Sequence, residues 1–287
     1  MNEQTWPKAW AIPQTMAPEA PELSIGDMTK IDASEFAAAY NAADPYPHIV
    51  IDDVFPPEVL RAVVREIGTI EVDPEKQRYA SVKKHRISDI WRMPPATRRL
   101  IEDLNSAPFV TLLEQITGIK GLIPDPHLEG GGVHQIGPGG YLKVHTDFNW
   151  HRRLQAHRRI NLLLYLNEGW REEWGGHLEL WSEGMDACRA RIAPLFNRMA
   201  IFSTTDSSYH GHPDRLACPE DVRRNSIALY YYSTDRPSGE TKFGRSEMTN
   251  YRERPGEEFE SGKLAHAFEQ ARVRVPLLRK FIDGLRR

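Results

Sequence analysis

The stretch Gly139–Asp147, GGYLKVHTD, contains the pattern that decides how we interpret the rest of the chain. Side chains of a β-strand alternate between its two faces, so His145 and Asp147 share one face if this stretch is a strand. An imidazole and a carboxylate on one face can bind a single metal ion. The stretch therefore predicts a strand that supplies two metal ligands, with a third ligand coming from another part of the chain.

The third ligand is expected in the segment 208–213, SYHGHP, which holds two histidines. If this segment is extended through Gly211, His210 and His212 face the same way and either could reach the metal. Pro213 restricts the residue before it and favours a turn, which would take His212 out of the strand. We therefore predict His210 as the ligand. Two imidazoles and one carboxylate leave adjacent coordination positions open, the facial arrangement of non-heme Fe(II) sites.

Further runs after the H-x-D pattern are rich in aliphatic and aromatic residues. Their ends carry Gly, Asn, Asp or Pro, which is typical of short strands. A series of this kind predicts a closed or sandwiched all-β unit. The runs are RRINLLLYLN from Arg158, GGHLELW from Gly175, APLFNRMAIFSTTD from Ala193 and RRNSIALYYYS from Arg223.

Six short motifs occur along this part of the chain in a fixed order: H-x-D, YLN, GG-x-L, P-x-x-NR-x-x-x-F, H-G-x-P and R-x-S. In this order the sequence resembles the 2-oxoglutarate/Fe(II)-dependent dioxygenase superfamily, and the prolyl-4-hydroxylase-like branch most closely. The resemblance covers residues 129–234 well and residues 45–128 loosely. It implies a mainly β fold with flanking helices, in which a double-stranded β-helix (jelly-roll, cupin-like) core is buttressed by helices.

The resemblance also implies Fe(II), 2-oxoglutarate and O2 as cofactors and cosubstrates, with ascorbate as a stimulant. The distal carboxylate of 2-oxoglutarate needs a cation, and a guanidinium can bind it through two hydrogen bonds. Arg224 and Ser226 match R-x-S and share one strand face, whereas Arg223 points the other way. Tyr165 resembles the tyrosine that hydrogen-bonds the same carboxylate. By the period of a strand, Asn161 is expected to face the same interior.

The resemblance implies hydroxylation of an unactivated C–H bond of a small molecule or an amino-acid or prolyl-type substrate, with release of succinate and CO2. Asp147 disfavours halogenation, because halogenases of the superfamily carry a small residue there. The basic segment 151–159, HRRLQAHRR, is expected near the mouth of the site. Residues that we expect on the substrate side are His212, Arg158, Trp150 and Gln135.

The composition bears on which partners the protein binds and in which compartment it is found. The formal net charge of −3 over 287 residues gives no polycationic surface, so we expect no nucleic-acid partner. The two cysteines have no metal-binding spacing and form no disulfide framework. No secretory leader and no apolar run of about 18 residues is visible, so we expect a cytoplasmic protein without a membrane partner.

We expect three parts along the chain. Residues 1–30 form an extended N-terminal arm, and residues 31–235 form the dioxygenase domain with N-terminal helical support. Residues 236–287 form a loop and C-terminal helices that pack on the core or, alternatively, join two subunits in a homodimer. Within the domain we expect a helix from Asp32 or Ser34, a strand at 47–55, helices at 57–68, 94–105 and 107–118, and polar irregular structure at 71–95.

Two other classes of function remain open at this point. The same barrel could serve a cupin-like isomerase or hydrolase with another divalent metal, and the absence of succinate formation would indicate that class. It could also serve as a binding module without turnover. The presence of His145, Asp147, His210 and Arg224 together disfavours a degenerate site, because such a site would be expected to have lost one of them.

Overall fold

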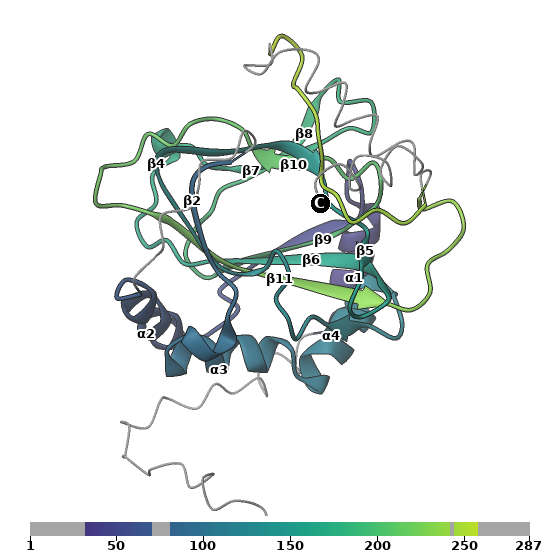
Figure 1. The fold of residues 1–287 in the computed structure, drawn as a ribbon, viewed down its shortest axis with the longest axis horizontal. Coiled ribbons are helices and arrows are strands. Elements are labelled where there is room, and N and C mark those ends of the chain that lie inside the picture. Colours follow the sequence, from purple (N-terminus) through teal and green to yellow (C-terminus); the bar gives the residue numbers. More distant parts are fainter. Residues whose placement is uncertain (1–31, 71–80, 242–243, 258–287) are drawn as a thin grey trace, which may run out of the picture.

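The structure is a computed structural model, and it describes residues 32–70, 81–241 and 244–257. Its core is an antiparallel sheet that curls into two facing layers (Figure 1). The main path of hydrogen-bonded strands runs β1 (His48–Asp52), β9 (Arg198–Ser203), β6 (Ala156–Tyr165), β11 (Arg224–Ser233), β4 (Gly132–Thr146), β10 (His210–His212), β7 (Leu178–Trp181) and β8 (Cys188–Ile192). Side pairings add β2 (Ser81–Ile87) and β12 (Asn250–Tyr251) to β4, β3 (Ile123–Pro124) to β11, and β5 (Trp150–His151) to β6.

Strand β4 connects the two layers. Its first half pairs with β11, where Ile136 lies opposite Arg224. Its second half pairs with β10, where His145 lies opposite His210. One strand therefore serves both walls of the core, and the segments before and after Gly139 line different sides of the interior. The double-stranded β-helix class predicted from the sequence is confirmed.

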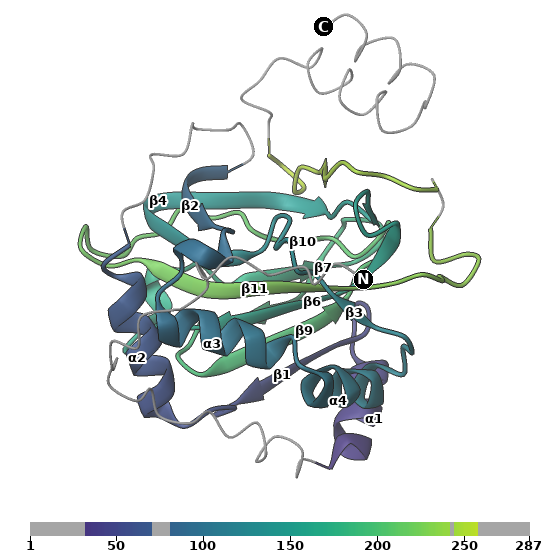
Figure 2. The same ribbon diagram turned by 60° about the horizontal axis from the view of Figure 1, so that its bottom comes forward.

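Four helices of the described chain buttress one layer: α1 (Ala33–Ala42), α2 (Pro57–Ile67), α3 (Pro95–Leu104) and α4 (Ala107–Thr117). In Figure 2 the helices α2, α3 and α4 lie against the outer side of the layer that contains β11, β6 and β9. Their buried aliphatic residues join those of the strands in one cluster, which includes Leu60, Leu100, Leu113 and Leu162. The helices thus cover the layer opposite to β10 and β7 and leave the space between the layers to the site.

Local chemistry sets the ends of these helices. Asp32 accepts a hydrogen bond from the Ser34 amide and caps α1. Helix α3 begins after Pro94, which cannot cap through its side chain, and the Glu66 carboxylate of α2 instead accepts the amides of Ala96 and Thr97 at 2.9 and 2.8 Å. This satisfies two free amides at a positive helix end and joins α2 to α3. Short 3₁₀ turns lie at Ile90–Arg92 and Glu172–Trp174.

Strand β2 corrects one prediction. The sequence predicted irregular structure for residues 71–95, but Ser81–Ile87 pairs with β4 over most of its length. The run SVKKHRI lacks apolar alternation, because one face of β2 carries Lys84 and Arg86, which line the interior cavity. A strand whose inner face is cationic gives no hydrophobic periodicity to detect.

Several predictions fall outside the described residues. These are the N-terminal arm at 1–30 and the C-terminal helices, whether they pack on the core or join two subunits. The domain boundaries therefore remain predictions. In the described ranges, no helix has the length and apolar character needed to cross a membrane. Cys188 and Cys218 are both free thiols.

Candidate metal centre and its cavity

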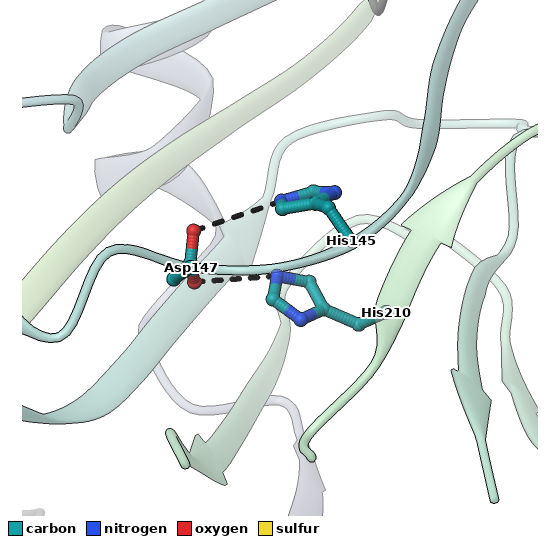
Figure 3. Close-up of side chains that lie close together, drawn as sticks. All are labelled: His145, Asp147 and His210. Carbon is teal, nitrogen blue, oxygen red and sulfur yellow. Dashed lines mark ion pairs between the residues drawn. The ribbon is translucent and has the colours of Figure 1, made fainter. Parts of the chain in front are cut away.

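The three predicted metal ligands meet between the two layers (Figure 3). His145 belongs to β4, His210 lies opposite it on β10, and Asp147 follows the last residue of β4. The two Asp147 carboxylate oxygens lie 3.6 Å from His145 Nε2 and 3.4 Å from His210 Nε2. One potential ligand atom from each residue falls within 4.8 Å of the others. Two nitrogens and one oxygen therefore converge on one point.

Backbone carbonyls set the tautomer of both imidazoles. His145 Nδ1 lies 2.7 Å from the Lys143 carbonyl, and His210 Nδ1 lies 3.0 Å from the Ser208 carbonyl. A carbonyl oxygen only accepts, so each Nδ1 carries the proton and each Nε2 presents a lone pair toward Asp147. Burial and the neighbouring His145 lower the pKa of His210 to about 4, so this ring is neutral at pH 7. This donor set fits a divalent transition metal.

Asp147 is held by two neighbours on β6. Arg158 Nη2 lies 2.9 Å from its Oδ2, and Asn161 Nδ2 donates to the same oxygen at 2.7 Å. Arg158 also donates twice to Asn161 Oδ1, at 2.9 and 2.7 Å. Burial alone would raise the pKa of Asp147, but the Arg158 charge holds it well below the usual value. The carboxylate is therefore ionised and oriented for a metal.

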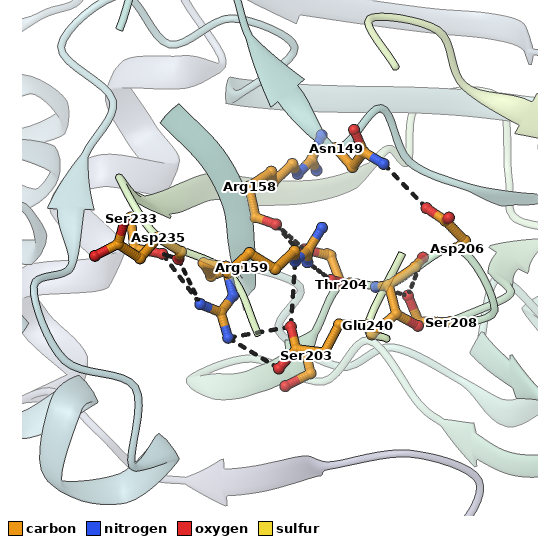
Figure 4. Close-up of polar contacts among 12 residues, drawn as sticks. Asn149, Arg158, Arg159, Ser203, Thr204, Asp206, Ser208, Ser233, Asp235 and Glu240 are labelled. Carbon is orange, nitrogen blue, oxygen red and sulfur yellow. Dashed lines mark hydrogen bonds and ion pairs between the residues drawn. The ribbon is translucent and has the colours of Figure 1, made fainter. Parts of the chain in front are cut away.

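A β-bulge brings Arg158 to the site. Tyr231 pairs with Ile160 and Tyr232 with Arg158, so Arg159 is the extra residue in β6. The bulge turns Arg158 to the face of Asn161, although three positions separate them. Its guanidinium carbon lies 3.4 Å from the centroid of the Tyr230 ring. Arg159 points away and donates to Ser233 Oγ and the Asp235 carbonyl, as Figure 4 shows.

Arg158 was predicted to contact the substrate and Asn161 to bind the cosubstrate. The structure gives both a different set of partners, because they bind the Asp147 carboxylate and each other. The alternation of side chains along a strand correctly predicted that Asn161 faces the interior. It could not place Arg158 beside it, because the bulge that does so depends on pairing with β11.

The other end of the cavity carries a buried guanidinium. Arg224 is 4% exposed, and its Nε donates to the Gly176 carbonyl at 2.7 Å. Its Nη2 lies 3.4 Å from the Tyr165 hydroxyl. No carboxylate of the described residues forms an ion pair with it, and burial lowers its pKa. A buried cation without an acidic partner is costly, so this end of the cavity fits an anionic ligand.

The motifs around Arg224 explain its orientation. Gly176 adopts φ +72°, and an added Cβ there would lie 3.0 Å from Arg224 Cδ. Asn167, at the end of YLN, accepts the Asn225 amide at 2.7 Å and donates to the Asn225 carbonyl at 3.1 Å. The GG-x-L and YLN motifs therefore hold the strand segment that carries Arg224. Ser226 lies on the same face and lines the cavity, whereas Arg223 is exposed, as parity predicted.

The cavity that joins the two ends has a volume of about 220 Å³. It includes residues that the sequence had not suggested, because their segments showed no strand pattern or no site motif. Tyr251 of β12 comes from the predicted loop after the core, and its ring centroid lies 5.4 Å from that of His145. The lining side chains are those of Lys84, Arg86, His134, Ile136, Leu142, His145, Asp147, Phe148, Arg158, Asn161, Leu163, Leu178, Phe202, His210, His212, Arg224, Ser226, Tyr230, Thr249 and Tyr251.

Two predicted substrate residues, Gln135 and Trp150, are not in this lining. Gln135 points to the opposite face of β4 from His134 and contacts Asn225 Oδ1 at 3.2 Å. Trp150 packs its ring against Arg245, at 3.7 Å from the guanidinium carbon. Strand alternation excludes the first from the interior, and the second belongs to the short β5 outside the cavity.

His212 does not leave the strand, contrary to the prediction of a turn near Pro213. It remains in β10 despite Pro213, and a register irregularity separates it from His210. Both imidazoles line the cavity, but His212 is not within the group of converging ligand atoms. It is 4% exposed, and neither ring nitrogen has a hydrogen-bond partner. Burial and the nearby Arg224 lower its pKa well below the usual value. An unsatisfied buried imidazole in a cavity wall indicates a ligand that it contacts.

Comparison with known proteins agrees with the site. Residues 131–232 match the family model described as the 2OG-Fe(II) oxygenase superfamily. This segment contains the three candidate ligands and Arg224. No curated protein sequence matches the chain.

Solved structures show the same fold. A prolyl hydroxylase from Trichoplax adhaerens, in complex with a hypoxia inducible factor peptide fragment, has 18% identity and a TM-score of 0.52, over 75% of this chain and 95% of that one. A prolyl 4-hydroxylase from Phytophthora capsici has 18% identity and a TM-score of 0.53, over 77% of this chain and 69% of that one. At this identity the likeness shows the fold alone.

Proposed function

We propose that this protein, a 2-oxoglutarate/Fe(II)-dependent dioxygenase, hydroxylates an unactivated C–H bond of a small-molecule or amino-acid-type substrate and releases succinate and CO2. The observation that carries the proposal is the pairing of two sites in one cavity. At one end two imidazoles and a carboxylate converge. At the other end a buried guanidinium has no acidic partner among the described residues.

We assign Fe(II) to His145, Asp147 and His210. Bound together, Fe(II), 2-oxoglutarate and O2 supply an oxidant strong enough to attack an unactivated C–H bond. The protein holds each imidazole in place through the ring nitrogen that does not face the metal site. The Lys143 and Ser208 carbonyls fix the imidazole tautomers. Such supporting contacts orient the first ligands and tune the metal.

We assign the distal carboxylate of 2-oxoglutarate to Arg224, with Tyr165 and Ser226 as hydrogen-bond partners. His212 completes this end, because it is the unsatisfied donor beside Arg224. A neutral imidazole offers one N–H, which a carboxylate oxygen can accept. The Arg158 charge keeps Asp147 ionised, and Arg158 and Asn161 together hold its carboxylate turned toward the metal.

The test is anaerobic binding followed by turnover. Fe(II) and 2-oxoglutarate are added to the protein under argon, and the visible charge-transfer band of the chelate is measured. O2 is then admitted together with a metabolite library, and succinate is quantified against each compound. A band without succinate under any condition would contradict the oxygenase assignment. Absence of both band and metal binding would contradict the metal site itself.

A further inference from the structure

The cavity carries more positive charge than the proposed cofactors neutralise. This surplus indicates the charge of the substrate, and the inference rests on the proposed function. Among the described residues that line it, Arg86, Arg158 and Arg224 are guanidinium groups and Asp147 is the carboxylate. Fe(II) and 2-oxoglutarate bring opposite charges of equal size. The loaded cavity keeps a surplus of positive charge, and Lys84 lies in the same wall.

Arg86 differs from the other two arginines. Arg158 is paired with Asp147, and Arg224 donates to Gly176 and faces the proposed cosubstrate end. Arg86 is exposed, and no carboxylate of the described chain lies within ion-pair distance of it. It lies opposite His134 in the β2–β4 register, and both side chains line the cavity.

Arg86 also lines a second, more open pocket of about 470 Å³, so it stands between the metal cavity and the surface. Arg152 and Arg153 of the basic segment 151–159 line this outer pocket and are exposed. Two acids, Glu129 and Glu247, lie there too, and Glu129 is in contact with His151 at 3.3 Å. Three guanidinium groups against two carboxylates leave the outer pocket positive as well.

We propose that the substrate is an anion, and that its carboxylate or phosphate group binds Arg86 at the junction of the two pockets. A guanidinium binds either group through two parallel hydrogen bonds. Positive potential inside a cleft with low-dielectric walls is stronger than at an open surface and concentrates anionic ligands. With its acid group at Arg86, the rest of the substrate extends toward the metal ligands. A cationic substrate would meet repulsion from Arg86.

The test uses four probes with one ring and different charges: phenyl phosphate, benzoate, benzamide and benzamidine. Binding to the protein loaded with Fe(II) and 2-oxoglutarate under argon is measured by calorimetry while the charge-transfer band is recorded. We expect the two anions to bind at least tenfold more tightly than benzamide, and benzamidine to bind most weakly. Arg86→Gln should remove the preference for anions and leave benzamide binding unchanged. Arg86→Lys should restore part of it.

Arg223→Gln is the matched control, because Arg223 is also exposed but lies outside both pockets and donates to the Glu220 carbonyl. Its anion preference should equal that of the unmodified protein. Equal binding of benzoate and benzamide, or an anion preference that survives Arg86→Gln, would overturn the proposal. So would loss of the band when benzoate binds, because the anion would then occupy the cosubstrate end. A protein that never shows the band would contradict the proposed function and not the anion site at Arg86, so the two failures are distinguishable.

Discussion

At the scale of single residues, the site depends on atoms that do not face the metal. The Nδ1 atoms of His145 and His210 donate to backbone carbonyls, and this leaves their Nε2 lone pairs aimed at one point. Asp147 is ionised because the Arg158 charge outweighs the effect of its burial on the pKa, and Asn161 donates a hydrogen bond to the same carboxylate. Each ligand is thus prepared before a metal arrives, which lowers the cost of ordering the site on binding.

The first prediction separates the two histidines of β10. His210→Ala should abolish the Fe(II)/2-oxoglutarate band, because it removes one converging nitrogen. His212→Ala should leave Fe(II) affinity near that of the unmodified protein and weaken 2-oxoglutarate instead. Metal and cosubstrate titrations of both variants under argon provide the measurement. The reverse ranking would transfer the ligand role to His212.

The second prediction concerns the carboxylate clamp. Arg224→Ala removes the proposed partner of a buried charge, a loss of roughly 3–5 kcal/mol, so the KM for 2-oxoglutarate should rise by on the order of a hundredfold or more. Arg224→Lys should recover only part, because an ammonium cannot reproduce the two-pronged contact. Tyr165→Phe should cost about 1 kcal/mol, the value of one hydrogen bond. Arg223→Ala is the control, and a damaging Arg223 with a silent Arg224 would refute the assignment.

A third prediction tests the role of Arg158 through pH. In the unmodified protein the pKa of Asp147 lies well below its usual value, so the carboxylate stays ionised throughout the neutral and mildly acidic range. In Arg158→Gln burial is no longer opposed by the guanidinium, so this pKa should rise. A proton then competes with the metal, and Co(II) affinity should fall more steeply between pH 7 and pH 5 than in the unmodified protein. Arg158→Lys, which keeps the charge, should flatten the profile again; parallel profiles for Gln and Lys would contradict this role.

At the scale of elements, irregularities in the strands decide which side chains meet. The bulge at Arg159 turns Arg158 inward, and the register irregularity in the β10–β4 pair places one extra residue of β4 between Leu142 and His145, which both line the cavity. Such bulges redirect side chains without changing the fold. The turn at Gly175 and Gly176 acts in the same way on Arg224, because it directs a carbonyl at its Nε.

The fourth prediction uses these two glycines as a matched pair. Both have positive φ, +68° at Gly175 and +72° at Gly176. A Cβ at Gly175 meets nothing within 4 Å, whereas one at Gly176 would lie 2.6 Å from Leu216 Cδ2 and 3.0 Å from Arg224 Cδ. Both Ala variants should lose about 1 kcal/mol of stability from backbone strain. Gly176→Ala alone should also raise the KM for 2-oxoglutarate, and equal KM values would contradict the link to Arg224.

At the scale of the whole molecule, the helices cover one layer of the sheet from outside, and the two layers enclose the site between them. The helices pack on the outer face of the layer with β11 and β6 and bury its outward-facing aliphatic side chains. Its inner face and the layer with β10 then enclose the polar cavity, in which ligand atoms from distant segments meet. Ligands that bind in such a cavity join both layers, so their binding stabilises the folded chain as a unit.

The fifth prediction follows from this linkage. Mn(II) and 2-oxoglutarate at a hundred times their dissociation constant each add about 2.7 kcal/mol, which should raise the melting temperature by roughly 5–10 °C in a protein of this size. Arg224→Ala should keep the increase from Mn(II) and lose the one from 2-oxoglutarate. Differential scanning calorimetry checks both. An Arg224→Ala protein that still responds fully to 2-oxoglutarate would place the cosubstrate elsewhere.

The sequence by itself determined the class of fold and the order of the site motifs. Strand alternation is a local property, so His145 with Asp147 and Arg224 with Ser226 could be placed on shared faces from spacing alone. The helices at 57–68, 94–105 and 107–118 followed from apolar periodicity and from the prolines and glycines at their ends. All of these depend on contacts between neighbours in the chain.

Only the tertiary structure decided what depends on pairing between distant segments. The bulge that turns Arg158 toward Asp147 exists because β6 and β11 pair with one residue in excess. Strand β2 carries cations on its inner face, so only its hydrogen bonds to β4 identify it as a strand and bring Arg86 to the cavity. His212 stays in β10 because Pro213 restricts the residue before it to extended conformations, which are compatible with pairing to β4. Strand alternation is local whereas strand pairing is not, and for this reason the three converging side chains could be proposed from the chain alone whereas the residues that support them could not.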